Sequence, residues 1–262
     1  MPSPGNEVWA IRYGSLELLR SAFFYDFAAY GEPDSTMQMD YLYFVVRTPA
    51  ETILVDCGFD PEVARRRGRT PLVDIDEGLA AVDLSVADID RVVLTHFHYD
   101  HIGNLSRFDS ARLVAQEAEV HFWQSPVARR RSFAEVAEPA ELLIIDEALS
   151  DGRLSLVNDR AEIAPGVQTE LVGGHTPGQQ LVIVETAGGP LVLASDALHC
   201  YEEIELDRPF HHFCDLAGTY RAFDRIRELE ANGARIVAGH DPLVASRFSG
   251  EGPGAPVAIR LG

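Results

Sequence analysis

The sequence predicts a layered α/β protein with a mixed sheet, and three observations support this prediction. Short apolar runs of strand length recur along the chain, and nearly all end at Gly, Pro or Asp. Amphipathic helical segments lie between them, and apolar strands need helices to cover them. The length of 262 residues, 46% of them hydrophobic, suits one large core. We therefore expect a single domain over residues 1–262.

Eight runs are predicted as strands: 41–47, 52–56, 91–95, 142–145, 169–172, 181–185, 191–194 and 234–238. Five segments between them are predicted as helices or helical turns: 61–67, 76–82, 85–88, 117–124 and 215–231. The last helix is the clearest, because Leu216, Tyr220 and Phe223 recur at helical spacing and Asn232-Gly233 is a typical helix end.

The charge balance excludes several functions. The chain has 22 basic and 41 acidic residues, a net charge of −19, and every basic residue is arginine. Without lysine, neither a Schiff-base lysine nor a phosphate-binding P-loop lysine is available. A strongly negative field repels nucleic acids and anionic membranes but tolerates a neutral small substrate. We therefore expect neither nucleic-acid nor membrane partners.

The cysteines and the N-terminus predict a cytoplasmic protein. Cys57, Cys200 and Cys214 are odd in number and show no C-x-x-C spacing, which is typical of a reducing compartment. Residues 1–14 lack the basic and apolar pattern of a signal peptide, and no run of 18 apolar residues follows.

The most informative segment follows the predicted strand 91–95 and has the pattern H-x-H-x-D-H. Residues two apart in an extended chain point the same way, so His96 and His98 are expected to bind one metal ion. The chain then turns, and Asp100 and His101 are expected to face a second metal ion. Two metal ions are therefore predicted.

Three further ligands are expected at later strand ends. His175, Asp196 and His240 each follow a predicted apolar strand. With His175, the pair His96 and His98 would form one three-ligand site with an open position, as catalytic zinc requires. His240 would complete the site of Asp100 and His101, and Asp196 would bridge the two. His121, His211 and His212 belong to no such pattern and are expected to be exposed or lightly packed.

With these residues the sequence resembles the metallo-β-lactamase superfamily over roughly residues 41–240. The resemblance rests on Val55-Asp56-Cys57-Gly58, Thr95 to His101, Gly174 to Gly178, Ser195-Asp196 and Gly239-His240. It implies a four-layer αββα sandwich with mixed sheets, the metals lying at one edge of the sheets. Asp56 is expected to orient a ligand histidine or the motif loop.

Within the superfamily, the sequence is similar to the N-acyl homoserine lactonases, which are quorum-quenching enzymes. The similarity rests on His175-Thr176-Pro177-Gly178 followed by two glutamines, and on Asp196-Ala197 after an apolar strand. Such lactonases carry a tyrosine three residues after the bridging aspartate, where this chain has His199, and Tyr201 follows two residues later. The resemblance therefore implies His199 or Tyr201 as the hydrogen-bond donor to the substrate.

The expected activity is hydrolysis of a lactone similar to an N-acyl homoserine lactone, by attack of metal-bound hydroxide on the ester carbonyl. The cofactor is expected to be two divalent ions per chain, zinc first, with iron, cobalt or manganese as alternatives. Asp100 or Asp196 would accept the proton of the nucleophile, and His199 or Tyr201 would stabilise the developing oxyanion. The substrate is expected to be small and neutral, with an apolar tail or an aromatic group. A homodimer is left open.

Three other functions share parts of this pattern. A glyoxalase II-like thioesterase uses the same ligands, but that family usually adds a helical region with basic residues, which is not expected in the short segment after His240. A β-lactam or other ester hydrolase is a second alternative, although β-lactamases commonly carry Cys or Ser where Asp196 stands. A non-catalytic metal-binding domain is the third, and two open coordination positions argue against it.

Two aromatic-rich segments, 22–30 and 209–213, are the remaining feature. One interpretation is that both segments pack in the core. A second interpretation is that they border an apolar cleft above the metals that holds an acyl chain or an aromatic ring. We expect the first segment, within residues 1–40, to contribute to the pocket wall.

Overall fold

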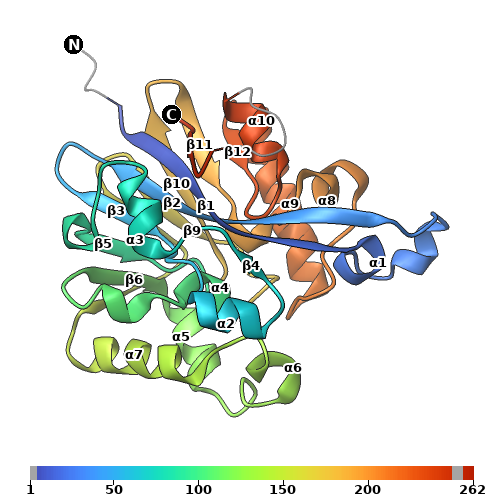
Figure 1. Cartoon of the computed structure of the whole chain (residues 1–262), viewed down its shortest axis with the longest axis horizontal. Helices are drawn as coiled ribbons and strands as arrows, with labels where there is room; N and C mark the ends of the chain where they lie inside the picture. The colour runs from blue at the N-terminus through green and yellow to red at the C-terminus, as the bar shows by residue number, and fades with distance from the viewer. Residues whose placement is uncertain (1–4, 250–255) are drawn as a thin grey trace.

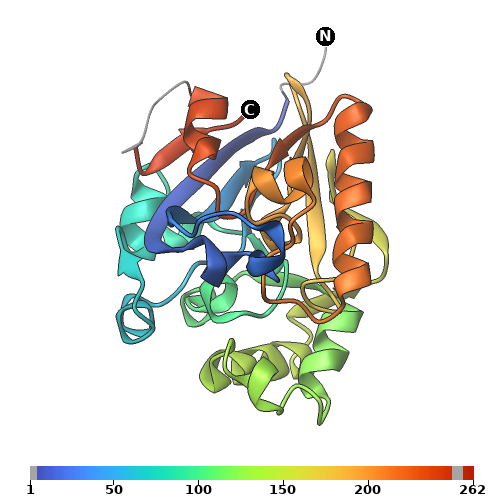
Figure 2. The ribbon, with the colours of Figure 1, turned by 90° about the vertical axis from the view of Figure 1, so that its right-hand side faces the viewer.

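Two mixed β-sheets packed face to face form the centre of the protein (Figures 1 and 2). The computed structural model describes residues 5–249 and 256–262. The first sheet has eight strands in the order β13-β1-β2-β3-β5-β6-β7, with β4 beside β1. The second sheet has five, in the order β12-β11-β10-β9-β8. Strands β3, β5, β6 and β7 pair in parallel, as do β11 and β12, and the other pairs are antiparallel.

The strands of the first sheet are β1 (Glu7–Leu19), β2 (Thr36–Arg47), β3 (Thr52–Val55), β4 (Thr70–Pro71), β5 (Arg91–Val93), β6 (Arg112–Gln116), β7 (Leu154–Val157) and β13 (Ala258–Arg260). Those of the second sheet are β8 (Arg160–Ala164), β9 (Val167–Leu171), β10 (Gln180–Thr186), β11 (Gly189–Leu193) and β12 (Arg235–Val237).

The helices are α1 (Arg20–Phe23), α2 (Pro61–Arg66), α3 (Ile75–Ala80), α4 (Tyr99–Ile102), α5 (Glu117–Gln124), α6 (Arg131–Ala134), α7 (Pro139–Ser150), α8 (Tyr201–Leu206), α9 (Leu216–Ala231) and α10 (Leu243–Ser249). Short 3-10 turns occur at Phe27–Tyr30, Val86–Asp88, Leu105–Arg107 and Ser195–Ala197. None of the helices in the described part of the chain is long and apolar enough to cross a membrane.

Successive side chains of the central strands point to opposite faces of the first sheet, so the core is divided into two halves. In β2, Phe44 faces the core between the sheets, whereas Tyr43 faces the core on the other side of the first sheet. Helix α9 packs Phe223 and Ile226 against the second sheet, and α3 and α7 cover the outer face of the first sheet. The order helix, sheet, sheet, helix confirms the predicted αββα sandwich.

One predicted strand is wrong and one long strand was not predicted. Residues 142–145 lie in α7, which begins with Pro139 at its first turn and buries Ile145 and Ala148 on one face while Leu143 is exposed. Strand β1 was missed because its burial does not alternate regularly, with the register shifting between Arg12 and Gly14. The five predicted helical segments correspond to α2, α3, the turn Val86–Asp88, α5 and α9.

Candidate metal centre

The H-x-H-x-D-H segment lies at the carboxyl end of β5, in the middle of the first sheet. His98 is the residue before α4, and α4 carries Asp100 and His101 in its single turn. This change from extended chain to helix turns the second pair of ligands away from the first. All four of these residues are buried, and none is more than 7% exposed.

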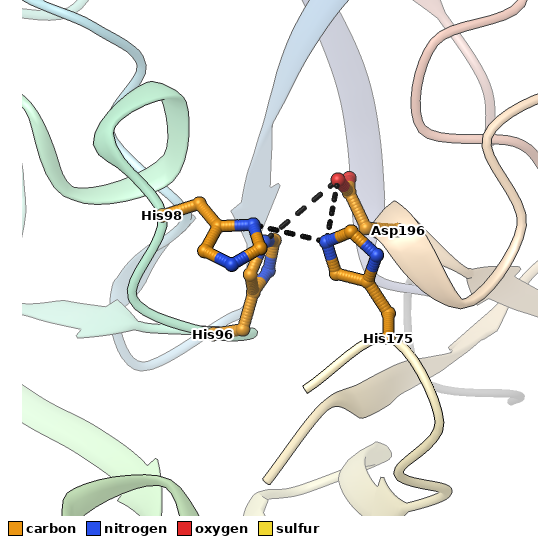
Figure 3. Close-up of side chains that lie close together, drawn as sticks. All are labelled: His96, His98, His175 and Asp196. Carbon is orange, nitrogen blue, oxygen red and sulfur yellow. Dashed lines mark hydrogen bonds and ion pairs between the residues drawn. The ribbon is translucent and has the colours of Figure 1, made fainter. Parts of the chain in front are cut away.

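The structure brings the seven expected ligands together in two groups. His96, His98, His175 and Asp196 offer ligand atoms within 4.8 Å of one another, and so do Asp100, His101 and His240. Figure 3 shows the first group, in which His98 Nδ1 lies 3.0 Å from His175 Nε2. Each group takes two residues from the loop after β5 and one histidine from the second sheet. The geometry is therefore that of two adjacent three-ligand sites.

Asp196 lies between the two groups, and each of its carboxylate oxygens faces one of them. Its Oδ1 lies 3.1 Å from His101 Nε2 and 2.9 Å from His240 Nε2. Its Oδ2 lies 3.3 Å from His175 Nε2 and 3.8 Å from His96 Nε2. Burial raises the pKa of Asp196, but His101 and His240 lower it well below its usual value, so the carboxylate stays ionised.

The donor set fits two divalent metal ions. The Nε2 atoms of His96 and His101 are buried and have no hydrogen-bond partner among the described residues. A buried polar atom without a partner is costly, and a cation at each position would satisfy it. Burial lowers the pKa of His96, His98 and His175 well below 6.5, with neighbouring histidines adding to the effect. These imidazoles are therefore neutral, which is the form that binds metal.

Hydrogen bonds on the outer side hold three ligand histidines in orientation. The Nδ1 atoms of His101, His240 and His175 lie 2.8 Å from Asp56 Oδ2, 2.8 Å from the Asp40 carbonyl oxygen and 2.9 Å from the His212 carbonyl oxygen. A proton on each Nδ1 leaves Nε2 free for a cation. Asp56 also accepts hydrogen bonds from the backbone N–H and hydroxyl of Thr95, at 2.8 and 2.7 Å. Its predicted orienting role is thus confirmed for both the histidine and the loop.

Glu119, in the first turn of α5, connects the loops that carry the first ligand group. Its carboxylate accepts hydrogen bonds from the Phe97 N–H at 2.9 Å, the Thr176 hydroxyl at 2.7 Å and the Gly178 N–H at 2.9 Å, and from the Trp123 side chain. Burial raises the pKa of Glu119, whereas these four donors lower it. A Cβ at position 178 would lie 2.3 Å from the Glu119 backbone nitrogen, so only glycine allows this close approach.

A cavity of about 130 Å³ opens beside the ligands. Four of the expected ligands line it, His98, Asp100, His175 and Asp196, together with Leu16, Leu18, Met39, Tyr41, Arg69, Tyr99, Val136, Phe210, His211 and His212. Residues 1–40 therefore contribute Leu16, Leu18 and Met39, although residues 1–4 lie outside the described part of the chain.

The aromatic side chains of segment 22–30 do not line this cavity. Phe23 and Phe24 are buried, and Phe23 packs edge-on against Phe210, with ring centroids 4.8 Å apart. The second aromatic segment thus contributes Phe210 to the cavity, and the first packs behind it. His211 and His212 were expected to be exposed or lightly packed, and both also border the cavity.

The structure separates the two residues that were predicted as substrate donors. His199 is buried beside Asp196, with Nε2 3.2 Å from Oδ2, and its ring packs on Phe210 at 3.9 Å. Tyr201 points elsewhere: its hydroxyl donates to the Ile236 carbonyl oxygen at 3.0 Å within the core between the sheets. The prediction for Tyr201 is therefore wrong, because helix α8 begins at this residue and turns its side chain away from the ligands.

Glu203 and Arg69 were missed by the sequence interpretation, as was Glu119. Glu203 lies on α8, accepts hydrogen bonds from the backbone of His199, Cys200 and Phe210, and places Oε2 3.4 Å from His199 Nδ1. Burial lowers the pKa of His199, but Asp196 and Glu203 outweigh it and raise the pKa to about 9. Single acidic or basic residues in a chain so rich in charge give no signal by which they could have been selected.

The sequence matches one protein family and several known proteins. Residues 40–240 match the family model described as the Metallo-beta-lactamase superfamily. An N-acyl homoserine lactonase from a Bacillus species is 25% identical over 225 residues, which cover 80% of this chain and 84% of that protein. The N-acyl homoserine lactonase AttM from Azorhizobium caulinodans is 27% identical over 226 residues, covering 76% of this chain and 81% of the relative.

Solved structures show the same architecture. A quorum-quenching N-acyl homoserine lactone hydrolase matches with a TM-score of 0.74 and 22% identity, covering 92% of this chain and 94% of that one. AidC, a dizinc quorum-quenching lactonase, matches with a TM-score of 0.73 and 19% identity, covering 92% and 89%. At this level of identity, the match supports a common fold.

Proposed function

The chain belongs to the metallo-β-lactamase superfamily, and from this premise we propose that it is a dinuclear metal-dependent hydrolase that opens the ring of an N-acyl homoserine lactone or a similar lactone. The observation that carries the proposal is the position of Asp196, whose two oxygens face two separate three-ligand groups. A bridging carboxylate between two open sites suits activation of water beside a polarised carbonyl. The lactonase relatives support the lactone as substrate.

His96, His98 and His175 would hold one ion, and Asp100, His101 and His240 the other, with Asp196 between them. When bound, two divalent ions would lower the pKa of a water molecule and polarise the ester carbonyl. Asp100 lines the cavity, and in this proposal it would accept the proton of the attacking water and return it to the leaving alkoxide.

His199 would take the place of the tyrosine found in such lactonases. Its Nε2 lies 3.2 Å from Asp196 Oδ2, on the side of the first ligand group. The Glu203 carboxylate lies beside Nδ1 of the ring, and Phe210 packs against the face of the ring. A proton on Nε2 would be available to the oxygen on which negative charge develops during ring opening.

The cavity supports a small neutral ring as the reacting group. Its volume of about 130 Å³ accommodates a lactone ring at the ligands, and Leu16, Leu18 and Met39 offer apolar lining for a tail. The net charge of −19 disfavours polyanionic substrates and favours release of a carboxylate product.

Zinc and a cytoplasmic location complete the proposal. Five histidine nitrogens and two carboxylates suit zinc, although iron, cobalt or manganese would also be held. Cys57, Cys200 and Cys214 are free, which supports a reducing compartment. A homodimer stays a prediction.

The test is a pH-indicator assay of purified protein with measured metal content, against lactones, thioesters and β-lactams. We expect turnover of lactones, loss of turnover in His96→Ala, and full turnover in His121→Ala, whose histidine is exposed and does not line the cavity. A protein that holds two ions and releases no acid from any lactone would refute the proposal.

A further inference from the structure

Arg69 is the one cation that lines the cavity among the described residues, apart from the histidines. It follows α2 and precedes β4, and its side chain is half-buried. Its Nε donates to the hydroxyl oxygens of Tyr99 at 2.8 Å and Tyr41 at 3.1 Å, and a second nitrogen donates to the Arg67 carbonyl oxygen. Within residues 5–249 and 256–262, no carboxylate oxygen lies within 4.0 Å of its guanidinium.

Arg67 provides a contrast two residues earlier. Its guanidinium lies over the ring of Tyr99 at 4.2 Å and pairs with the Glu138 carboxylate at 2.8 and 3.0 Å. It also donates to the Glu135 carbonyl oxygen at 2.7 Å, and it does not line the cavity. The chain therefore neutralises one of these two arginines with a carboxylate and leaves the other facing the cavity without one.

The groups around Arg69 accept hydrogen bonds without cancelling its charge. These groups are the phenol hydroxyls of Tyr41 and Tyr99, which carry no charge at neutral pH. Asp100 lines the same cavity, but in the proposed function this carboxylate binds a metal ion. A half-buried guanidinium without a counter-charge is unfavourable unless another acceptor approaches it. The cavity is where such an acceptor would arrive.

We propose that Arg69 binds the exocyclic amide carbonyl of an N-acyl lactone, and that it thereby selects N-acylated lactones over lactones with a plain alkyl chain. This inference rests on the proposed function. The amide is attached to the ring carbon next to the reacting carbonyl, so its oxygen lies only a few bonds from that carbonyl. Arg69 and Asp100 line the same cavity, whereas Leu16, Leu18 and Met39 offer no donor. A neutral carbonyl oxygen is a good acceptor for a charged donor.

The test compares two substrates of equal chain length in four proteins. The substrates are N-hexanoyl homoserine lactone and a γ-butyrolactone with an alkyl chain on the same ring carbon, and the proteins are wild type, Arg69→Gln, Arg69→Lys and Arg67→Gln. A hydrogen bond to a charged group predicts a preference of about 10- to 100-fold in kcat/KM for the amide substrate in wild type. We expect Arg69→Gln to abolish this preference by raising KM for the amide substrate, while kcat/KM for the alkyl lactone is unchanged.

Arg69→Lys should retain part of the preference and Arg67→Gln all of it. The inference would be overturned if the ratio of kcat/KM for the two substrates were unchanged in Arg69→Gln, whether both values fell equally or neither fell. If Arg69→Gln does not fold, the test uses Arg69→Lys and the wild-type ratio of kcat/KM for the two substrates. A wild type that shows no preference for the amide substrate also overturns the inference. Wild type that hydrolyses neither lactone refutes the proposed function itself, which is a different result from lactone hydrolysis without preference.

Discussion

Replacing Glu119 is expected to weaken one metal site and leave the other intact. The residue contacts no ligand directly, but it accepts hydrogen bonds from Phe97, between His96 and His98, and from Thr176, next to His175. Removing its carboxylate would free both loops that position the first ligand group. The group of Asp100, His101 and His240 has no hydrogen bond to Glu119 among the described residues.

The size of the effect follows from the four donors that Glu119 satisfies. Each buried donor left without an acceptor costs about 1–3 kcal/mol, and partial relaxation limits the sum for Glu119→Ala to about 3–5 kcal/mol of unfolding free energy. Glu119→Gln keeps one oxygen and places an amide NH2 against donors, so we expect a loss of about 1–3 kcal/mol. Glu117→Gln is the matched control, because Glu117 lies in the same helical turn with a side chain 37% exposed.

Urea unfolding followed by circular dichroism measures the stability, and elemental analysis after dialysis measures the metal content. We expect metal content to fall from about two ions per chain to about one in Glu119→Gln, with Glu117→Gln unchanged. If the two variants unfolded at the same urea concentration and held equal metal, the positioning role of Glu119 would be refuted.

Three further predictions follow from the same structure. Tyr201→Phe removes the hydrogen bond to the Ile236 carbonyl and should lower unfolding free energy by about 1 kcal/mol while leaving kcat for lactones unchanged; a large fall in kcat would restore Tyr201 to the site. Burial, with Asp60 adding to it, raises the pKa of Glu141 to about 7, so the stability that its neutral form contributes is present below about pH 4.5 and is lost as pH rises through 7. Glu141→Gln should therefore gain about 1–2 kcal/mol over wild type between pH 5 and pH 8 in urea titrations, after discounting for partial exposure, whereas the exposed control Glu147→Gln should show a flat difference. Chelation should abolish lactone turnover until Zn²⁺ is restored, and dialysis at a series of pH values should show metal loss only well below pH 6.5, because burial lowers the pKa of His96, His98 and His175 and protons compete with metal only there.

The sequence was most informative where chemistry and periodicity coincide. His96, His98, Asp100 and His101 stand out because four ligands within six residues serve no common packing role, and their partners could be located because each follows an apolar strand. The strand at 142–145 was misassigned because a short apolar run does not distinguish a strand from the buried face of a helix.

The supporting residues were beyond the reach of sequence patterns. Glu119 and Arg69 act through contacts with loops 22 or more residues away, and only the folded chain brings these groups together. Tyr201 was assigned to the site from its distance along the chain to Asp196, but the start of α8 determines its direction. Local spacing predicted which residues come together as candidate metal ligands, whereas tertiary packing determines which residues hold those candidates in place.

Each proposed ion takes two ligands from the loop after β5, in the first sheet, and one from the second sheet, and Asp196 also belongs to the second. Bound metal would therefore crosslink the two sheets at one edge of the core between them. The loaded protein should unfold as one cooperative unit, because neither sheet can separate without releasing both ions. The chelated protein keeps apolar packing and hydrogen bonds across that edge, among them those of Asp40 with His240 and of Gln180 with Leu94, and its unfolding is expected to be less cooperative. Metal content would then govern the cooperativity of unfolding as well as the chemistry.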